Sequence, residues 1–427
     1  MGGKPIARNS KHLVSSGMQL LAFLSRHRSL RMLWLGEIIS QAGDSLFQLA
    51  LIWLVLSLTG SSSLTGLVAM SAYLPVLILG LPAGALVDRL DRRRVMLGAN
   101  AARALLAGTI PLLAFRGLLD PLLLGAITFA MAVFSAHFNP ARDALVPELV
   151  PPAELRPANA LIQSGWQLAL LAGPGLAGLL TPLTGELHLF TATALAYLLS
   201  AGFIASMPAT HKGQGRTAGR LQLSHELRQA MAKAGEGLAL ARRDRRLWAI
   251  LLVTGADNLF IMGPAIVGTP LFVKQVLHGS SGDYAYLLTA YAVGMICGSL
   301  ALARWGKQLR DSRLLLWGIV LDGITFLPLL WVSSFAGAWL TLFIHSLMIP
   351  LIVVPRPTLI QRMVPAEFHG RVFAMVSVAV TGLSAVSVAL TGLVAEWVPV
   401  PWIFGSIAVL GALCGLAGWT IREFRDA

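Results

Sequence analysis

Long, uninterrupted apolar segments dominate the chain, and short polar segments separate them. Twelve of these segments are about 20 residues or longer, which is the length that an α-helix needs to cross the hydrocarbon core of a bilayer. Because they show no alternation of polar and apolar residues, they predict helices rather than the strands of a β-barrel. The predicted spans are 33–58, 64–87, 95–115, 118–138, 160–183, 187–207, 247–276, 284–303, 313–333, 337–355, 372–395 and 402–421.

The spans occur in two sets of six that share sequence markers. Gly84 corresponds to Gly298 (298 − 84 = 214), and Arg142 corresponds to Arg356 at the same offset (356 − 142 = 214). Such internal duplication is typical of transporters with a binding site between two repeats. We therefore predict an all-α membrane protein with twelve transmembrane helices in two six-helix, pseudo-symmetric bundles. The predicted segments are 1–32 (N-terminal), 33–207 (first bundle), 208–246 (linker with an amphipathic helix at 221–240), 247–421 (second bundle) and 422–427 (tail).

The composition and the distribution of charge agree with this prediction. Hydrophobic residues make up 56% of the chain and charged residues only 12%, whereas a soluble domain carries roughly 25% charged residues. The net charge of +13 would suggest a nucleic-acid partner for a soluble protein. Here the Lys and Arg residues gather in alternate loops on one side, which instead predicts cytoplasmic termini, insertion in the cell inner membrane and no nucleic-acid partner.

One face of the first span is polar. Its residues are spaced by four, three and four positions, which places them on the same side of a helix: Glu37, Gln41, Asp44 and Gln48. Asp44 lies roughly 16 Å into the span at 1.5 Å per residue, near the bilayer centre. This face is expected to line a central cavity, where Asp44 would bind a proton reversibly. The alternative is a structural polar network with Arg103, Asn258 or Gln167 as partners.

Other polar residues at membrane depth extend the candidate site. Asp257 occupies the position in the second set of spans that corresponds to Asp44 in the first, and Asp322 lies in the ninth span. Glu37 lies near the cytoplasmic end of the first span, and the alternative for this residue is a purely interfacial role. Arg103, the one cation predicted inside a span, would either bind an anionic substrate or pair with a carboxylate, and pairing is favoured. The proton-coupling candidates are Asp44, Asp257, Asp322 and Glu37. The substrate-cavity candidates are Gln41, Gln48, Arg103, Gln163, Trp166, Gln167, Asn258 and His345.

The basic turn between the second and third spans, residues 84–96, resembles the signature G-x-L-x-D-R-x-G-R-[RK] of the major facilitator superfamily, with Asp91 in place of its glycine. The segment 138–151 resembles the fourth-to-fifth loop of the third drug:proton antiporter group, which includes macrolide efflux proteins and enterobactin exporters. The resemblance implies that Asp88 contacts the start of the eleventh helix and holds one conformational state. The members of this predicted latch are Gly84, Asp88, Arg89, Arg92, Arg142 and Arg371.

The predicted function is a proton-coupled secondary active exporter that works by alternating access. Its cargo is expected to be an amphipathic small molecule such as a drug, a macrolide or a siderophore, because the cavity has few fixed charges. A lysophospholipid flippase or a nutrient carrier of the same fold is the alternative, and a channel or a membrane-embedded enzyme is disfavoured. The sequence has no H-E-x-x-H, G-x-S-x-G or G-x-x-x-x-G-K-[ST] motif, so we expect no enzymatic activity, metal or cofactor. The expected partners are the cargo, protons and lipid, with the protein as a monomer.

Overall fold

The computed structural model describes residues 23–87, 90–208, 241–306, 309–365 and 368–425, together with six single residues between 228 and 239. Most of the N-terminal segment and most of the predicted amphipathic helix at 221–240 therefore lie outside the described residues. Within the described part of the chain every regular element is helical. The prediction of an all-α fold is confirmed.

The described part of the first half contains seven labelled α-helices and, between the fifth and sixth of them, the 3-10 helix η1 (Pro152–Glu154). The α-helices are α2 (Arg28–Thr59), α3 (Ser62–Met70), α4 (Leu74–Val87), α5 (Arg92–Phe115), α6 (Pro121–Leu149), α7 (Leu155–Thr184) and α8 (His188–Ala205). A turn at residues 71–73 separates α3 from α4, and together these two helices make the second crossing. Ser61 caps the start of α3 by accepting a hydrogen bond from the Leu64 backbone N–H.

The second half repeats this arrangement with more interruptions. Its elements are α10 (Arg245–Gly263), the π-helical η2 (Pro264–Gly268), α11 (Thr269–Gln275), α12 (Ser281–Trp305), α13 (Asp311–Ile324), η4 (Leu327–Leu330), α14 (Phe335–Met348), α15 (Pro350–Val353), α16 (Pro355–Met363), α17 (His369–Val394), α18 (Val400–Trp419) and α19 (Arg422–Arg425). Pro264, Pro350 and Pro355 each begin a new segment, because proline lacks the N–H that continues the helical hydrogen bonds.

Eleven helical stretches of the described residues are long and apolar enough to cross a membrane, and α7, with 30 residues, is long enough to make a twelfth crossing. The predicted twelve-helix, two-bundle membrane fold is confirmed. One boundary differs clearly, because α6 continues to Leu149 instead of ending near 138. Its last turns keep an apolar face, and Phe138, Ala141 and Leu145 are buried there. Packing of that face offsets the cost of Pro140 and Pro147 inside the helix.

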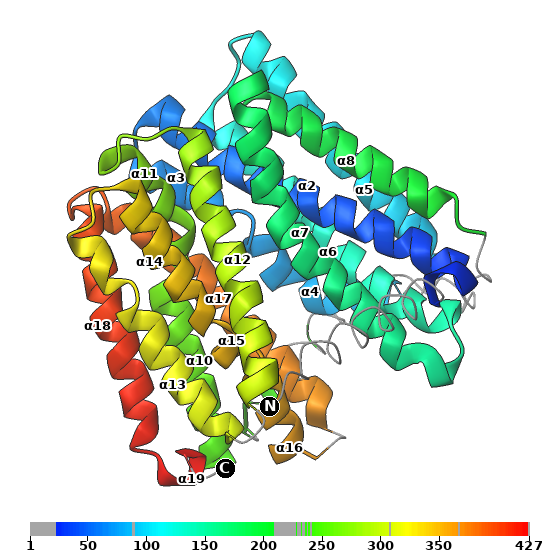
Figure 1. The fold of residues 1–427 in the computed structure, drawn as a ribbon. Helices are drawn as coiled ribbons and strands as arrows, with labels where there is room; N and C mark the ends of the chain where they lie inside the picture. Colours follow the sequence, from blue (N-terminus) through cyan, green and yellow to red (C-terminus); the bar gives the residue numbers. More distant parts are fainter. Residues whose placement is uncertain are drawn as a thin grey trace, which may run out of the picture.

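The two ends of the bundle differ in charge and in packing. We call the end where α2, α5 and α10 begin the basic end, since each of these helices starts at an arginine. Two separate apolar cores lie near this end, one in each half. At the opposite end a single apolar core includes residues of both halves, such as Leu51 of α2 and Phe272 of α11. Figure 1 shows α7 and α12 near each other and the two groups of helices diverging from there.

Candidate transport site

The boundary between the two halves, here called the seam, is closed by close helix contact at the end of the bundle opposite the basic end, which we call the opposite end. A Cβ atom on Gly66 of α3 would lie only 2.8 Å from the Val388 carbonyl oxygen and 2.9 Å from the Gly392 Cα of α17. The two backbones therefore meet without a side chain between them, as small residues allow in membranes. Trp53 of α2 stacks on Tyr284 of α12 with ring centroids 6.2 Å apart. These contacts join four helices from the two halves.

Polar groups reinforce the same closure. Glu396, just after α17, accepts hydrogen bonds from the Ser61 hydroxyl at 2.8 Å and from the Ser63 backbone N–H at 2.9 Å. The donors at Ser63 and Ser61 hold the pKa of Glu396 below its ordinary value of 4.5. Lys274 of α11 donates to the Leu56 carbonyl oxygen of α2 at 2.7 Å. The Glu396 carboxylate of the second half lies at the N-terminus of α3 of the first half, where negative charge is favoured.

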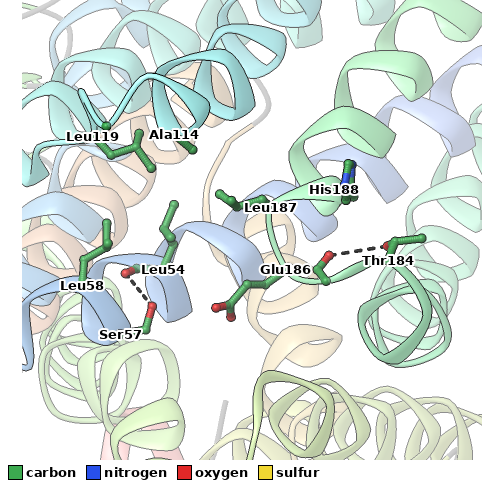
Figure 2. Close-up of a pocket in the computed structure, with 11 residues that line it drawn as sticks. Leu54, Ser57, Leu58, Ala114, Leu119, Thr184, Glu186, Leu187 and His188 are labelled. Carbon is green, nitrogen blue, oxygen red and sulfur yellow. Dashed lines mark hydrogen bonds between the residues drawn. The ribbon is translucent and has the colours of Figure 1, made fainter.

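A hollow of about 660 Å³ opens beside this closed seam, between the ends of α2, α5 and α7 and the start of α8. Figure 2 shows apolar side chains such as Leu54, Leu58 and Leu119 around it, and Glu186 extending from the loop after α7 toward the end of α2. Burial raises the pKa of Glu186, and the neighbouring Ser281 and Lys274 counteract this effect. The hollow belongs mainly to the first half and lies away from the predicted midplane candidates.

An ion pair between the buried Arg103 and the partly exposed Asp44 occupies the centre of the first half. Arg103 of α5 is 1% exposed, and its Nη1 lies 3.1 Å and 3.3 Å from the two carboxylate oxygens of Asp44. The Tyr197 hydroxyl of α8 donates to Asp44 Oδ1 at 2.6 Å. The Arg103 guanidinium also lies 4.4 Å from the Tyr197 ring centre and 4.9 Å from that of Phe138. Of the two alternatives for Arg103, this geometry corresponds to pairing with a carboxylate.

Small polar residues complete the surroundings of Arg103. Its Nη2 donates to the Ser40 hydroxyl at 3.0 Å and to Asn100 Oδ1, and its Nη1 lies 3.3 Å from the Ser135 hydroxyl of α6. Asn100 in turn donates to Ser200 at 2.8 Å. Sequence reasoning missed these partners. The spacing of Asn100 and Arg103 on one face of a span was the available signal.

A second ion pair lies nearer the basic end. Glu37 is 1% exposed and pairs with Arg142 of α6, while Gln41 donates to the same carboxylate at 3.0 Å. Arg142 also contacts the neighbouring Asp143. The residues of the polar face predicted on α2 therefore have different surroundings. Glu37 and Gln41 lie at the ion pair with Arg142, Asp44 pairs with Arg103, and Gln48 is exposed.

The second half holds its acidic residues differently. Asp257 of α10, Asp322 of α13 and His345 of α14 are 8%, 3% and 1% exposed. Within the described residues, Oδ1 of Asp257 and Oδ1 of Asp322 have no hydrogen-bond partner. His345 Nδ1 lies 3.5 Å from Asp322 Oδ1 and 3.2 Å from the Asp322 carbonyl oxygen. Arg356 of α16 is close enough for its charge to act on Asp257.

Asn258 connects this acidic group to the seam between the halves. Its amide donates to the Thr254 carbonyl oxygen at 2.9 Å, and its Oδ1 lies 3.4 Å from the Ser384 hydroxyl of α17. A second hollow, of about 250 Å³, lies between α4, α6 and α17 and so has walls from both halves. Ser135 and Asn139 line it from α6, and Ser377 from α17.

The remaining candidates are less informative. Gln163 is exposed on α7, and Trp166 and Gln167 lie in the same helix with side chains outside the description. Gly84 lies in α4, whereas Asp88 and Arg89 fall outside the described residues. In the described part of the latch, Arg92 pairs with Glu148 and Arg371 with Glu236 at 3.1 Å. The latch stays a prediction, and no group of three or more potential metal ligands occurs in the described ranges.

Comparisons with known proteins extend over most of the chain. Residues 21–424 match the family described as transmembrane secretion effector. Macrolide efflux protein A of Streptococcus pyogenes is 26% identical over 80% of this chain and 83% of its own. The uncharacterized MFS-type transporter YfiS of Bacillus subtilis is 28% identical over 99% and 96%, and the multidrug efflux pump Tap of Mycobacterium tuberculosis is 30% identical over 62% and 63%.

Solved structures share the fold at low sequence identity. The peptide transporter POT, in a crystal structure with alafosfalin, superimposes with a TM-score of 0.73 at 12% identity, covering 93% of this chain and 94% of the other. A bacterial homologue of the human lysosomal transporter Spinster, in an inward-facing and unoccupied conformation, gives a TM-score of 0.66 at 14% identity, covering 94% and 96%.

Proposed function

Because this chain belongs to the transmembrane secretion effector family of the major facilitator superfamily, we propose that it is a secondary active exporter that exchanges protons for an amphipathic small molecule. The bundles 33–207 and 247–421 act as the two rocking units of an alternating-access cycle. The relatives named for macrolide and multidrug efflux support export as the direction of transport. Few fixed charges along the seam favour a cargo with large apolar surfaces.

The observation that carries this proposal is the one-sided closure of the seam. One apolar core spans both halves at the opposite end, while each half has its own core near the basic end. A channel needs a path open at both ends, whereas a carrier closes one end at a time. The contact between Gly66 and Gly392 acts as the closed gate of this cycle.

The orientation follows from charge. Arginines begin α2, α5 and α10 at the basic end, and the positive-inside bias assigns this end to the cytoplasm. Both chain termini are then cytoplasmic in the inner membrane, and the conformation described is open toward the cytoplasm. A single chain contains both halves of the pathway, so the monomer is the functional unit.

The proton carriers in this proposal are Asp257 and Asp322. A buried carboxylate without a hydrogen-bond partner is costly when charged and favours binding a proton. Oδ1 of each aspartate meets this description among the described residues. Oε2 of Glu37 also lacks a hydrogen-bond partner among the described residues, but Glu37 pairs with the partly buried Arg142 and Asp44 with the buried Arg103, so each of these two charges has an opposite charge in direct contact.

Flux into and out of proteoliposomes tests the proposal. Purified protein is reconstituted with an imposed pH gradient, and uphill movement of a macrolide and of a cationic dye is followed. We expect uphill flux with wild type, and its loss in Asp257→Asn and Asp322→Asn, with downhill exchange of the cargo retained. Asp120→Asn is the matched control, since Asp120 is exposed and makes no cap hydrogen bond.

Two outcomes would contradict this reasoning. Flux that ignores the pH gradient in wild type would exclude proton coupling. Uphill flux at the wild-type rate in both asparagine variants would exclude Asp257 and Asp322 as carriers.

A further inference from the structure

The hollow between α4, α6 and α17 has walls from both halves of the molecule. Its volume is about 250 Å³, and Leu77 of α4 lines it together with residues of α6 and α17. A Cβ atom on Gly382 of α17 would lie 3.6 Å from Leu77. The hollow therefore lies beside the point where α4 and α17 still touch, at the edge of the closed part of the seam.

Uncharged hydrogen-bonding groups face this hollow from two helices. Ser135 and Asn139 are one turn apart on α6, and Ser377 and Thr381 are one turn apart on α17. This spacing places each pair on one side of its helix. Among the described residues, Asn139, Ser377 and Thr381 make no side-chain hydrogen bond with the protein. The rest of the lining that the structure describes is apolar and carries no charge.

Both walls connect to the buried polar groups. On the α6 side, the Ser135 hydroxyl lies 3.3 Å from Arg103, which holds Asp44. On the α17 side, Ser384 follows Thr381 by one turn and lies 3.4 Å from Asn258. A molecule bound between the walls would therefore contact Ser135, which touches Arg103, and Thr381, which lies one helical turn from the neighbour of Asn258.

We propose that this hollow is a cargo subsite that binds an uncharged part of the cargo bearing hydroxyl, ether or carbonyl groups. The inference rests on the proposed function and specifies which part of the cargo is recognised. Free hydroxyl and amide groups in an apolar pocket recognise such groups by hydrogen bonding. The volume, below the range of about 300–1,000 Å³ typical of whole-ligand pockets, holds a ring-sized part of a larger molecule. The hollow lies between the closed gate and the basic end, so its walls approach each other when the basic end closes in the proposed cycle, and the subsite binds this part only in the conformation described.

Kinetics of downhill efflux test the subsite. The probes are erythromycin, which has hydroxyl, ketone and lactone groups, and ethidium, which has none of these. We expect Thr381→Val and Asn139→Ala each to raise KM for erythromycin about threefold to tenfold, the loss of one uncharged hydrogen bond, with kcat unchanged. KM for ethidium stays at the wild-type value. Thr289→Val is the matched control, because Thr289 is only partly buried on α12, does not line the hollow and bonds within its own helix.

Labelling by a maleimide gives a second readout that does not depend on transport rates. In a background in which Cys297 and Cys414, the two native cysteines, are replaced by serine, we expect erythromycin to slow the labelling of Ser377→Cys. Labelling of Val386→Cys, at an exposed position of α17, stays unchanged.

The possible failures are distinguishable. If wild type carries erythromycin, but both variants keep the wild-type KM and Ser377→Cys is not protected, the subsite is wrong and the exporter proposal stands. An equal rise in KM for erythromycin and ethidium would also overturn the subsite, because it would indicate a general packing defect. If wild type carries neither probe and neither protects Ser377→Cys, the exporter proposal and the subsite both fail.

Discussion

Replacing Arg103 by methionine removes a cation that is enclosed by protein on every side. The Arg103 side chain is 2% exposed and that of its partner Asp44 is 37% exposed. Methionine keeps the length and much of the apolar volume of the side chain. The change therefore tests the charge and its hydrogen bonds more than the packing against Tyr197 and Phe138.

The expected cost follows from the burial of the two partners. Breaking a fully buried ion pair costs about 3–5 kcal/mol, and an exposed pair contributes about 0–1 kcal/mol. Since Asp44 is about one-third exposed while Arg103 is buried, the pair lies between these limits, at about 2 kcal/mol. Loss of the donor to the buried Asn100 amide oxygen adds about 1 kcal/mol. We expect Arg103→Met to lower the free energy of unfolding by about 3 kcal/mol in total.

The assay is unfolding in mixed micelles by titration with sodium dodecyl sulfate, followed by circular dichroism. A double-mutant cycle with Asp44→Asn should give a coupling energy of about 2 kcal/mol. Arg116→Met is the control, because Arg116 is exposed at the opposite end, and its change should stay within about 0.5 kcal/mol. A coupling energy below about 0.5 kcal/mol would refute the assignment of Arg103 and Asp44 as a stabilising pair.

Two further predictions concern the closed gate. Gly66→Ala places a methyl group 2.9 Å from the Gly392 Cα, so the closed conformation of the gate should lose about 1–3 kcal/mol of stability. Distances between spin labels across the opposite end should therefore lengthen. Gly98→Ala, whose added methyl group meets no atom within 4 Å, should leave these distances unchanged. The contact of Glu396 with Ser63 lowers the pKa of the carboxyl from 4.5, so the contact is complete above pH 4.5 and is lost as the pH falls through the lowered value. The same spin-label distances should therefore lengthen in acid for wild type, whereas Glu396→Gln should lose this pH dependence; an unchanged response in Glu396→Gln would contradict the assignment.

Hydropathy alone predicted the number and order of the crossings, because a helix that crosses a bilayer needs about 20 apolar residues whatever its neighbours are. The ends were less predictable. Residues 138–149 appeared as a loop because they contain Pro140, Pro147 and several charges, yet they continue α6. Burial of Phe138 and Leu145 against the core at the basic end decides this segment, and that tertiary contact has no local signature.

Helical spacing predicted which residues share a face but not what each of them meets. Glu37 and Asp44 do lie on one side of α2, yet the first meets Arg142 of α6 and the second meets Arg103 of α5. Choosing the partner requires the relative rotation of three helices, which depends on packing of many side chains at once. The hollow lined by Ser377 could not be predicted from the sequence for the same reason, since its walls come from helices that are far apart in the chain.

The two halves share a fold and differ in how they treat buried acids, and this difference suggests a division of labour. In the first half, Glu37, which is buried, and Asp44, which is partly exposed, each pair with an arginine, and such a pair organises structure. The position equivalent to Arg103 in the second half is Trp317 (103 + 214 = 317), which is half exposed and supplies no charge. Asp257 and Asp322 each have an oxygen without a donor among the described residues, as Glu37 does, but neither forms a salt bridge with an arginine there, in contrast to Glu37 and Asp44. A carboxylate that must gain and lose a proton in each cycle needs this incomplete neutralisation, and a carboxylate with a fixed arginine does not have it. Under the proposed function, the first half supplies the arginine-paired polar core, and Asp257 and Asp322 of the second half are the acids that gain and lose a proton.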